Sequence, residues 1–484
     1  MRRVASFVPL FAAGIAAATS AIAQPAATPR DAKSTAAQRE EVSITVYNQN
    51  FGLVREIRNV DLGTGRIALE LRDVAATIQP ATVSIKSLGA PGNGGALKVL
   101  EQNYRYDLLS PQTLLAKYVG RKIKVYRFNE KLGTEEAFDA EVISVSNGVV
   151  LKINGEITFD FRGRFAFPEV PPNLIAKPTL VWLLDSQQAK QKIEVTYLAG
   201  GMRWSADYVL TIDEKDAEAD LRGWVTLVNG SGASYDNAKL KLVAGDVQRV
   251  SGNEEAQDGD VSTKSSDDKE KRDGFREEAF FEYHLYSLEQ PTSVLDNEQK
   301  QINLLSASGI KVEKKLFFYG QPYFYRRQSG QVQSNQKVSV FLEIDNSEKN
   351  RLGMPLPKGV VRVYKADRSG AKQFIGEDSI DHTPRDEKIL IKMGEAFDVV
   401  GERKQTSFKV LGSCNAESAW EISLRNHKDV EAAVEDVEPI GGDWTMVQSS
   451  PPHTKKDAHT FTFRVKVPAR GETKIVYTVR VRWC

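Results

Sequence analysis

The chain has 484 residues, of which 41% are hydrophobic and 27% are charged, and this composition excludes a disordered or collagen-like chain. Its 65 basic and 64 acidic residues nearly cancel, so the protein has no strongly basic field that would collect nucleic acid or anionic lipid. At roughly 100–200 residues per domain, this length allows about two to four domains.

Residues 1–23 have the pattern of a secretory signal peptide. Arg2 and Arg3 precede an apolar run over residues 4–18, and Ala21-Ile22-Ala23 offers small residues for cleavage. The run is too short for a membrane span, which needs about 20 apolar residues. We therefore expect an exported protein that is periplasmic, secreted or associated with the outer membrane, with no transmembrane helix in the mature chain.

The alternation of apolar and polar residues at period two predicts an all-β fold. Residues 24–40 form a polar lead that we expect to be flexible, and clear alternation follows at residues 42–46 and 193–197. Asn147-Gly148 and Asn154-Gly155 lie between β-branched segments, as tight hairpins require, because Asn and Gly tolerate positive φ. These segments indicate short strands joined by turns.

One helix is predicted, over residues 110–118, with Ser110 as its N-cap and Pro111 at its first helical position. About five short strands follow it, which is typical of a small SH3-like or Sm-like barrel, although ordinary meander strands are the alternative. The expected division is an N-terminal β domain at 41–105, the barrel-like unit at 106–170, a sandwich-like central β domain at 171–404 and an immunoglobulin-like sandwich at 405–484.

Residues 252–276 interrupt the central domain. The stretch from Ser251 to Glu278 holds ten acidic and five basic residues, with Val261 and Phe275 as its larger apolar side chains. Such a segment buries too little apolar surface to offset the entropy of ordering it. We expect a disordered acidic loop between strands, and a functional acidic segment is the alternative.

Cys414 and Cys484 are the two cysteines of the chain. An exported protein reaches an oxidising compartment, where a pair of cysteines forms a disulfide that persists. The two residues lie near the start and at the end of the C-terminal strands, so we predict a bridge between them. Two unpaired thiols, one of them open to intermolecular bonding, are the alternative.

Several motifs of the second half are long enough to be specific. The longest is Tyr197-Leu198-Ala199-Gly200-Gly201-Met202-Arg203-Trp204, and the others lie at residues 190–193, 223–229, 241–247, 283–286, 380–384, 425–428 and 479–483. With these motifs the chain resembles the bacterial family called "domain of unknown function 4139" over most of residues 170–484. Some relatives are labelled mucoidy inhibitors. The resemblance implies a β-rich exported protein and no established catalytic residue.

No motif predicts catalytic residues, a metal site or a cofactor. No pair of the five histidines has the i, i+4 spacing or the H-E-x-x-H motif of a zinc protease, and a site assembled from distant histidines is the alternative. Cys414 lacks the motif context of a nucleophile. Acidic residues gather around His382, at Glu377, Asp378, Asp381, Asp386 and Glu387. A hydrogen-bonded turn is the favoured interpretation of this loop, and a calcium-binding loop is the alternative.

Residues 317–325 are unusually rich in aromatic side chains, with six in nine residues. A strand pair buried in a core, with Gln321-Pro322 as its turn, is the favoured interpretation. Aromatic rings beside charged groups are also how proteins hold sugars or extended peptides. The candidate binding residues are Tyr319, Tyr323, Tyr325, Arg326 and Arg327.

Together these patterns favour a non-catalytic envelope protein that serves as a scaffold or binds an envelope partner or polysaccharide. The alternative is a periplasmic hydrolase acting on glycan or peptide, and assembly or chaperone roles remain. A pocket with two convergent carboxylates about 5–10 Å apart would favour the hydrolase. An exposed aromatic face would favour binding.

Overall fold

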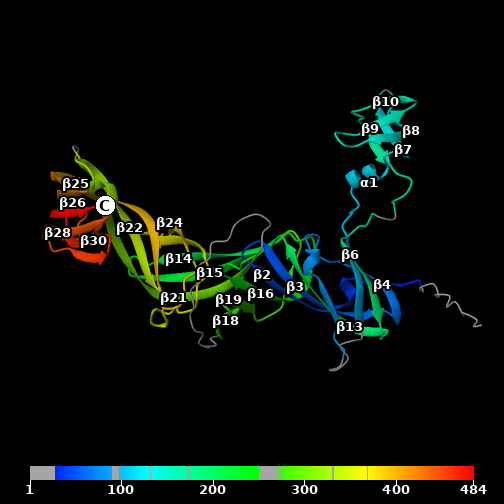
Figure 1. Cartoon of the computed structure of the whole chain (residues 1–484), viewed down its shortest axis with the longest axis horizontal. Helices are drawn as coiled ribbons and strands as arrows, with labels where there is room; N and C mark the ends of the chain where they lie inside the picture. Colours follow the sequence, from blue (N-terminus) through cyan, green and yellow to red (C-terminus); the bar gives the residue numbers. More distant parts are fainter. Residues whose placement is uncertain are drawn as a thin grey trace, which may run out of the picture.

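The computed structural model describes residues 28–89, 97–130, 132–171, 174–249, 271–272, 275–329, 332–367 and 369–484. The signal peptide predicted at 1–23 and most of the insertion predicted at 252–276 lie outside these ranges. The described residues contain 31 strands and one α-helix, which confirms the all-β prediction. Figure 1 shows an elongated body of strands, from which a small unit stands off on an arm. Within the described ranges, no helix is both long and apolar enough to cross a membrane.

The N-terminal part of the body consists of two sheets that share one apolar core. Residues from both sheets, such as Leu69 and Trp182 of one and Ile44 and Val195 of the other, belong to the same buried cluster. The smaller sheet has the order β1 (Arg30–Ser34), β4 (Gly65–Arg72), β12 (Thr179–Ser186) and β6 (Leu97–Arg105). The larger sheet has the order β17 (Lys271–Arg272), β18 (Phe275–Phe280), β19 (Tyr283–Leu288), β16 (Tyr235–Ala244), β2 (Arg39–Tyr47), β3 (Phe51–Asp61), β13 (Lys190–Gly200) and β5 (Ser84–Ser87), with β20 (Thr292–Val294) beside β16.

Two segments predicted to be flexible contain strands. In the polar lead, β1 pairs in parallel with β4, and Ala32 and Ser34 are buried there. At the end of the predicted insertion, β17 pairs with β18, whose first residue Phe275 is buried in the core. In both places, backbone pairing and one or two inward side chains order a segment whose composition is polar.

The small unit holds the predicted helix. Helix α1 (Pro111–Lys117) has Ser110 as its N-cap, and the Ser110 hydroxyl accepts a hydrogen bond of 3.1 Å from the Thr113 amide. The Asn154-Gly155 turn has positive φ at both residues, as its hairpin requires. The strands follow the order β10 (Glu156–Thr158), β9 (Val150–Ile153), β8 (Thr134–Ser144), β7 (Lys122–Asn129) and β11 (Arg164–Ala166). The described residues contain no pairing between the edge strands β10 and β11, so this ladder is open rather than a closed barrel.

A single sheet of thirteen strands joins the middle of the body to its C-terminal end. Two of its strands, β21 (Glu298–Tyr319) and β25 (Lys388–Gly412), have 22 and 25 residues. The order is β24 (Lys372–Ile380), β23 (Gly359–Ala366), β14 (Met202–Ile212), β15 (Glu218–Asn229), β21, β22 (Gln333–Asp345), β25, β26 (Asn415–Asn426), β31 (Glu472–Arg482) and β28 (Asp443–Ser450). Strands β27 (Ala432–Pro439), β30 (Thr460–Val467) and β29 (Thr454–Asp457) are attached beside it.

The boundary expected at residue 405 falls inside β25. The C-terminal core also includes side chains that precede this position, among them Phe318, Val338 and Val399. Because a long strand passes from one core to the next without a turn, the chain shows no linker signal where the core changes. Short 3-10 helices lie at Ala36–Gln38 (η1), Pro80–Thr82 (η2), Pro322–Tyr325 (η3) and Glu348–Asn350 (η4).

Candidate functional site

The aromatic segment lies where β21 ends and the helical turn η3 begins. Residues 317–319 close β21, and Pro322 to Tyr325 form η3. The second half of the segment is therefore a helical turn and not the second strand of the expected pair. Proline cannot donate to a strand ladder and is well placed at the start of a helical turn, which accounts for this difference.

The five candidate residues divide between the surface and the core. Tyr319 is 42% exposed and Tyr323 is 53% exposed, and Arg326 and Arg327 are also exposed. Tyr325 is 1% exposed and belongs to the C-terminal core. The favoured interpretation, a segment buried in a core, thus holds for Tyr325. The other four residues are exposed and are here called the exposed aromatic-basic surface.

A neighbouring aromatic ring packs against each of the two exposed tyrosine rings. Tyr319 stacks on Phe317, with ring centres 5.8 Å apart. Partial burial and the nearby charge of Glu435 raise the pKa of the Tyr319 hydroxyl. Tyr323 meets the buried Phe324 ring edge-on at 4.9 Å. Rings held in this way lose little conformational entropy when a ligand covers them.

The two arginines keep their donors available. Within the described parts of the chain, neither Arg326 nor Arg327 makes an ion pair. A Cβ atom at Gly441 would lie 2.9 Å from Arg326 Nη2, so the absence of a side chain there leaves room for the guanidinium group. Each guanidinium presents up to five N–H donors to a ligand beside the rings.

Beneath this surface lies a set of buried polar side chains, here called the C-terminal charge cluster: Tyr325, Arg403, Asp436, Glu438 and Tyr477. Arg403 donates to Glu438 and, at 3.4 Å, to Asp436. Tyr325 donates to Glu438 and lies 2.9 Å from the Tyr477 hydroxyl. The Arg403 guanidinium also lies 5.0 Å from the centre of the Phe318 ring and 5.3 Å from that of Phe324.

One of the two carboxyl groups in this cluster, that of Asp436, has a shifted pKa. Burial, followed by the negative charge of Glu438, raises the pKa of the Asp436 carboxyl well above its usual range. Asp436 Oδ2 accepts no hydrogen bond from the described residues. Both observations favour the neutral, protonated form of the Asp436 carboxyl.

The sequence analysis missed this cluster, although a signal was present. Ala432 and Val434 lie on the inward face of β27, and period two places Asp436 and Glu438 on the same face. Arg403 likewise follows the buried Val399 and Gly401 on β25. Charged residues that continue an inward apolar pattern on two strands indicate a buried ion pair.

The two carboxyl groups converge, but they are sealed from solvent. The side chains of Arg403, Asp436 and Glu438 have no exposed surface. A general acid and its partner must reach the bond that they cleave. In this conformation, no substrate can approach Asp436 or Glu438.

In the acidic segment around His382, Glu377 and Asp378 each bind a different partner. Glu377 pairs with Arg362 at 3.2 Å, and Asp378 accepts a bond of 2.7 Å from the Lys392 amide. Thr383 and Leu356 exchange backbone hydrogen bonds across the turn. In the described ranges, no group of three or more His, Cys, Asp or Glu side chains is placed to hold a metal ion.

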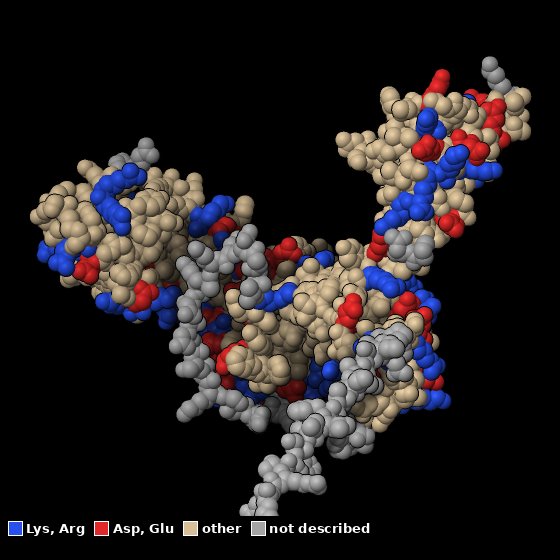
Figure 2. All heavy atoms as spheres, turned by 45° about the vertical axis from the view of Figure 1, so that its right-hand side comes forward, with Lys and Arg blue, Asp and Glu red and all other residues tan. Residues whose placement is uncertain are grey.

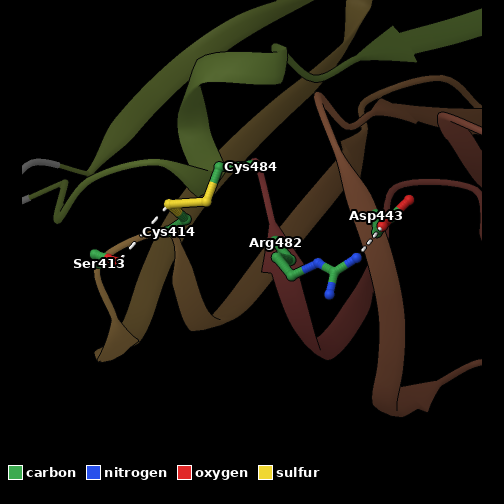
Figure 3. The surroundings of a disulfide bond; sticks show 5 residues. All are labelled: Ser413, Cys414, Asp443, Arg482 and Cys484. Carbon is green, nitrogen blue, oxygen red and sulfur yellow. Dashed lines mark hydrogen bonds and ion pairs between the residues drawn. A yellow bond between two sulfur atoms is a disulfide. The ribbon is translucent and has the colours of Figure 1, made fainter.

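The predicted disulfide is present in the structure. Cys414 and Cys484 are bonded, with their Cα atoms 5.7 Å apart, within the range such bridges prefer. Figure 3 shows the bridge beside the ion pair of Arg482 and Asp443, which measures 2.9 Å. The Trp483 amide also donates to the Cys414 carbonyl at 3.0 Å, so the C-terminal end is held by a covalent and a hydrogen bond.

A comparison with known families gives one match. The family described as "Domain of unknown function (DUF4139)" matches residues 193–484, more than half of the chain. The matched part includes the exposed aromatic-basic surface, the C-terminal charge cluster and the disulfide. No curated protein is similar enough to the chain to count as a relative.

Proposed function

The chain belongs to the DUF4139 family, and we propose that it is an exported, non-catalytic protein of the cell envelope that binds a polysaccharide through the exposed aromatic-basic surface. Export is supported by the charged and apolar pattern of residues 1–23 and by the disulfide between Cys414 and Cys484.

One observation carries the proposal: Tyr319 and Tyr323 expose their rings, and the hydrogen bond from the buried Tyr325 to Glu438 anchors η3, the turn that carries Tyr323. Aromatic rings offer a large, rigid contact area to sugar faces, and guanidinium groups donate hydrogen bonds to hydroxyl or carboxylate oxygens. Arg326 and Arg327 supply those donors directly after η3. A rigid support of this kind lowers the entropic cost of binding.

The alternative function is hydrolysis of glycan or peptide, and the observation that favours it is the convergence of Asp436 and Glu438 on Arg403. For hydrolysis, η3 would have to move away and open the core. The burial of the carboxyl pair therefore supports a structural role for it, with binding at the surface above.

A glycan array probed with the chain from residue 24 onward, disulfide formed, tests the proposal. We expect retention on a subset of glycans and a loss of affinity of about fivefold to tenfold for Tyr323→Ala, since one aromatic contact contributes about 1 kcal/mol. Tyr106→Ala is the matched control, because Tyr106 is 74% exposed and lies at the arm of the small unit.

Thermal unfolding of each variant separates binding from folding. Tyr323→Ala should keep the midpoint of the parent protein, because the ring it removes is half exposed. No retention on any glycan, or equal binding by Tyr323→Ala and the parent, would mean that this surface does not bind saccharides. Retention of envelope proteins alone would replace the saccharide by a protein partner.

A further inference from the structure

A cavity of about 630 Å³ lies on the outer face of the four-stranded sheet, at the foot of the arm. Its walls are the ends of β1, β4, β6 and β12 and the linker at residues 174–177. Figure 2 shows basic and acidic side chains close together where the arm joins the body. The volume falls in the range of about 300–1,000 Å³ that is typical of small-molecule sites.

Strand register places charged side chains side by side on this face. Thr179 of β12 lies opposite Arg72 of β4 on one side and opposite Arg105 of β6 on the other. Lys33 of β1 lies opposite Glu70 of β4. Residues directly opposite in neighbouring strands point to the same face, so these side chains all border the cavity.

Cations outnumber carboxylates around the cavity. The lining includes Lys33, Arg72, Arg105 and Lys177, against Glu70 and Asp73.

Glu70 accepts from both arginines, at 2.8 Å from Arg72 and 3.2 Å from Arg105. Asp73 pairs with Lys177 at 2.5 Å. Lys33 makes no ion pair within the described part of the chain. Because a guanidinium has five donors, one bond from each arginine to Glu70 leaves several for a ligand.

On the inner side of the sheet that lines the cavity, a buried cluster of charged side chains carries more positive than negative charge. The N-terminal charge cluster consists of Arg39, Glu56, Arg58 and Tyr197. Two guanidinium groups there share one carboxylate, and Arg58 donates to the Arg72 carbonyl at 2.9 Å.

The field of this cluster reaches the cavity. Partial burial disfavours the ionised form of Asp73, yet hydrogen bonds from Lys177 and the Ala36 amide, together with the charge of Arg58, hold its pKa below the usual value. Low-dielectric surroundings strengthen such charge effects. The lining cations in excess of Glu70 and Asp73 and the buried surplus therefore both favour a negative group in the cavity.

We propose that this cavity binds the anionic group, a carboxylate or a phosphate, of a small ligand such as an acidic sugar. Arg72 and Arg105 hold the anion from two sides, and Lys33 supplies the unpaired positive charge. Planar guanidinium groups match the oxygen spacing of carboxylates and phosphates. The site precedes the matched family region at 193–484 and is separate from the exposed aromatic-basic surface, so it stands independently of the function proposed above.

Isothermal titration calorimetry of the full mature chain tests the site with four probes: inorganic phosphate, glucose 6-phosphate, glucuronic acid and glucose. We expect the three anions to bind and glucose to give no heat above dilution. Tighter binding of glucose 6-phosphate than of inorganic phosphate assigns the cavity to a sugar phosphate, and equal binding assigns it to the anion itself. Affinity should fall as salt rises, because the ligand competes with other anions.

Variants locate the binding in the cavity. Lys33→Gln and Arg105→Gln should each weaken binding of the anions about tenfold, the loss of about 1.4 kcal/mol. Lys98→Gln is the matched control, because Lys98 is an exposed lysine of β6 outside the cavity lining. Lys33→Gln breaks no ion pair with the described residues, so its unfolding midpoint should equal that of the parent.

Three results would overturn the proposal. The first is that no anion gives heat at millimolar concentration. The second is that glucose binds as tightly as glucuronic acid. The third is that Lys33→Gln and Arg105→Gln bind the anions with the affinity of the parent protein. Tyr323→Ala should bind the anions as the parent does, which keeps this test separate from the glycan array.

Discussion

The two charge clusters of this molecule have opposite balances. The N-terminal cluster places two guanidinium groups, Arg39 and Arg58, around the single carboxylate of Glu56. The C-terminal cluster places two carboxyl groups around the single guanidinium of Arg403. A carboxyl group can take up a proton and become neutral, whereas a guanidinium cannot lose one at ordinary pH. The C-terminal cluster can therefore reach neutrality, and the N-terminal cluster keeps a surplus positive charge.

This difference matters for what lies above each cluster. The surplus charge of Arg39 and Arg58 adds to the cations that line the cavity on the four-stranded sheet. The neutral C-terminal cluster instead acts as a rigid support, since Tyr325 ties η3 to Glu438 beneath the exposed aromatic-basic surface. The buried charges of the N-terminal cluster thus help to attract an anion, and those of the C-terminal cluster hold η3 in position.

The largest loss in the free energy of unfolding is expected for Glu56→Gln. The change leaves two buried guanidinium groups without their carboxylate, and breaking a buried ion pair costs about 3–5 kcal/mol. Since two pairs depend on Glu56, we expect a loss of about 5 kcal/mol in the free energy of unfolding, measured by urea denaturation. Glu40→Gln, on the neighbouring strand β2, removes an exposed ion pair with Lys192 and should leave the midpoint unchanged. A Glu56→Gln protein as stable as its parent would contradict this account of the N-terminal cluster.

Removing the disulfide is the next largest change, and it affects the C-terminal region alone. Cys414 and Cys484 are 70 residues apart in the chain, and loop-closure entropy gives about 4 kcal/mol for a bridge of this length. The double variant Cys414→Ser, Cys484→Ser should therefore unfold at lower urea than the parent. Reduction of the parent with dithiothreitol should give the same shift. An unchanged midpoint in both experiments would show that the bridge contributes nothing to stability.

A smaller loss is expected for Glu438→Gln. Arg403 would lose its ionised partner, but Asp436 lies 3.4 Å from it and can ionise in place of Glu438. We expect a loss of about 3 kcal/mol, at the lower end for a broken buried pair. Glu435→Gln, on the outward face of the same strand, removes a surface pair with Arg464 and should cost less than about 1 kcal/mol. If Glu438→Gln lowers the free energy of unfolding as much as Glu56→Gln does, Asp436 does not replace Glu438 as the partner of Arg403.

The smallest effect is a pH dependence carried by Asp436. Its folded pKa is raised, so its contribution to stability is fully present below the ordinary carboxyl pKa and is lost as pH rises toward the folded value. Asp436→Asn copies the neutral form and has no such loss. Between pH 4 and 5, the free energy of unfolding of the parent should fall relative to Asp436→Asn by about 1 kcal/mol. Parallel pH profiles of the two proteins would show that Asp436 is ionised in the folded state.

Local signals predicted a large part of the fold. Alternation gave strands around residues 42–46 and 193–197, Ser110 and Pro111 marked the start of α1, and the two cysteines indicated the bridge. Each of these signals lies in a few neighbouring residues or in a pair with no other partner. The polar strand β1 was missed because its order comes from pairing with β4 rather than from its own composition.

The sites were harder to predict, for a physical reason. Tyr319 and Tyr323 were found because six aromatic residues stand together in the chain, but composition could not tell that Tyr325 turns into the core. The cavity brings Lys33 together with Lys177, residues whose proximity depends on strand register and on the path of the arm. Long strands such as β25 also hide the change from one core to the next, because no turn marks it.

The proposal that this protein binds a saccharide without cleaving it is tested most directly by native mass spectrometry. The chain from residue 24 onward would be incubated for hours with an oligosaccharide retained on the array, and the mass of the complex would be followed over time. We predict a complex of constant mass that holds the intact oligosaccharide and that Tyr323→Ala weakens. Shortened oligosaccharides that accumulate with the parent protein but not with Glu438→Gln would contradict the proposal and identify a hydrolase.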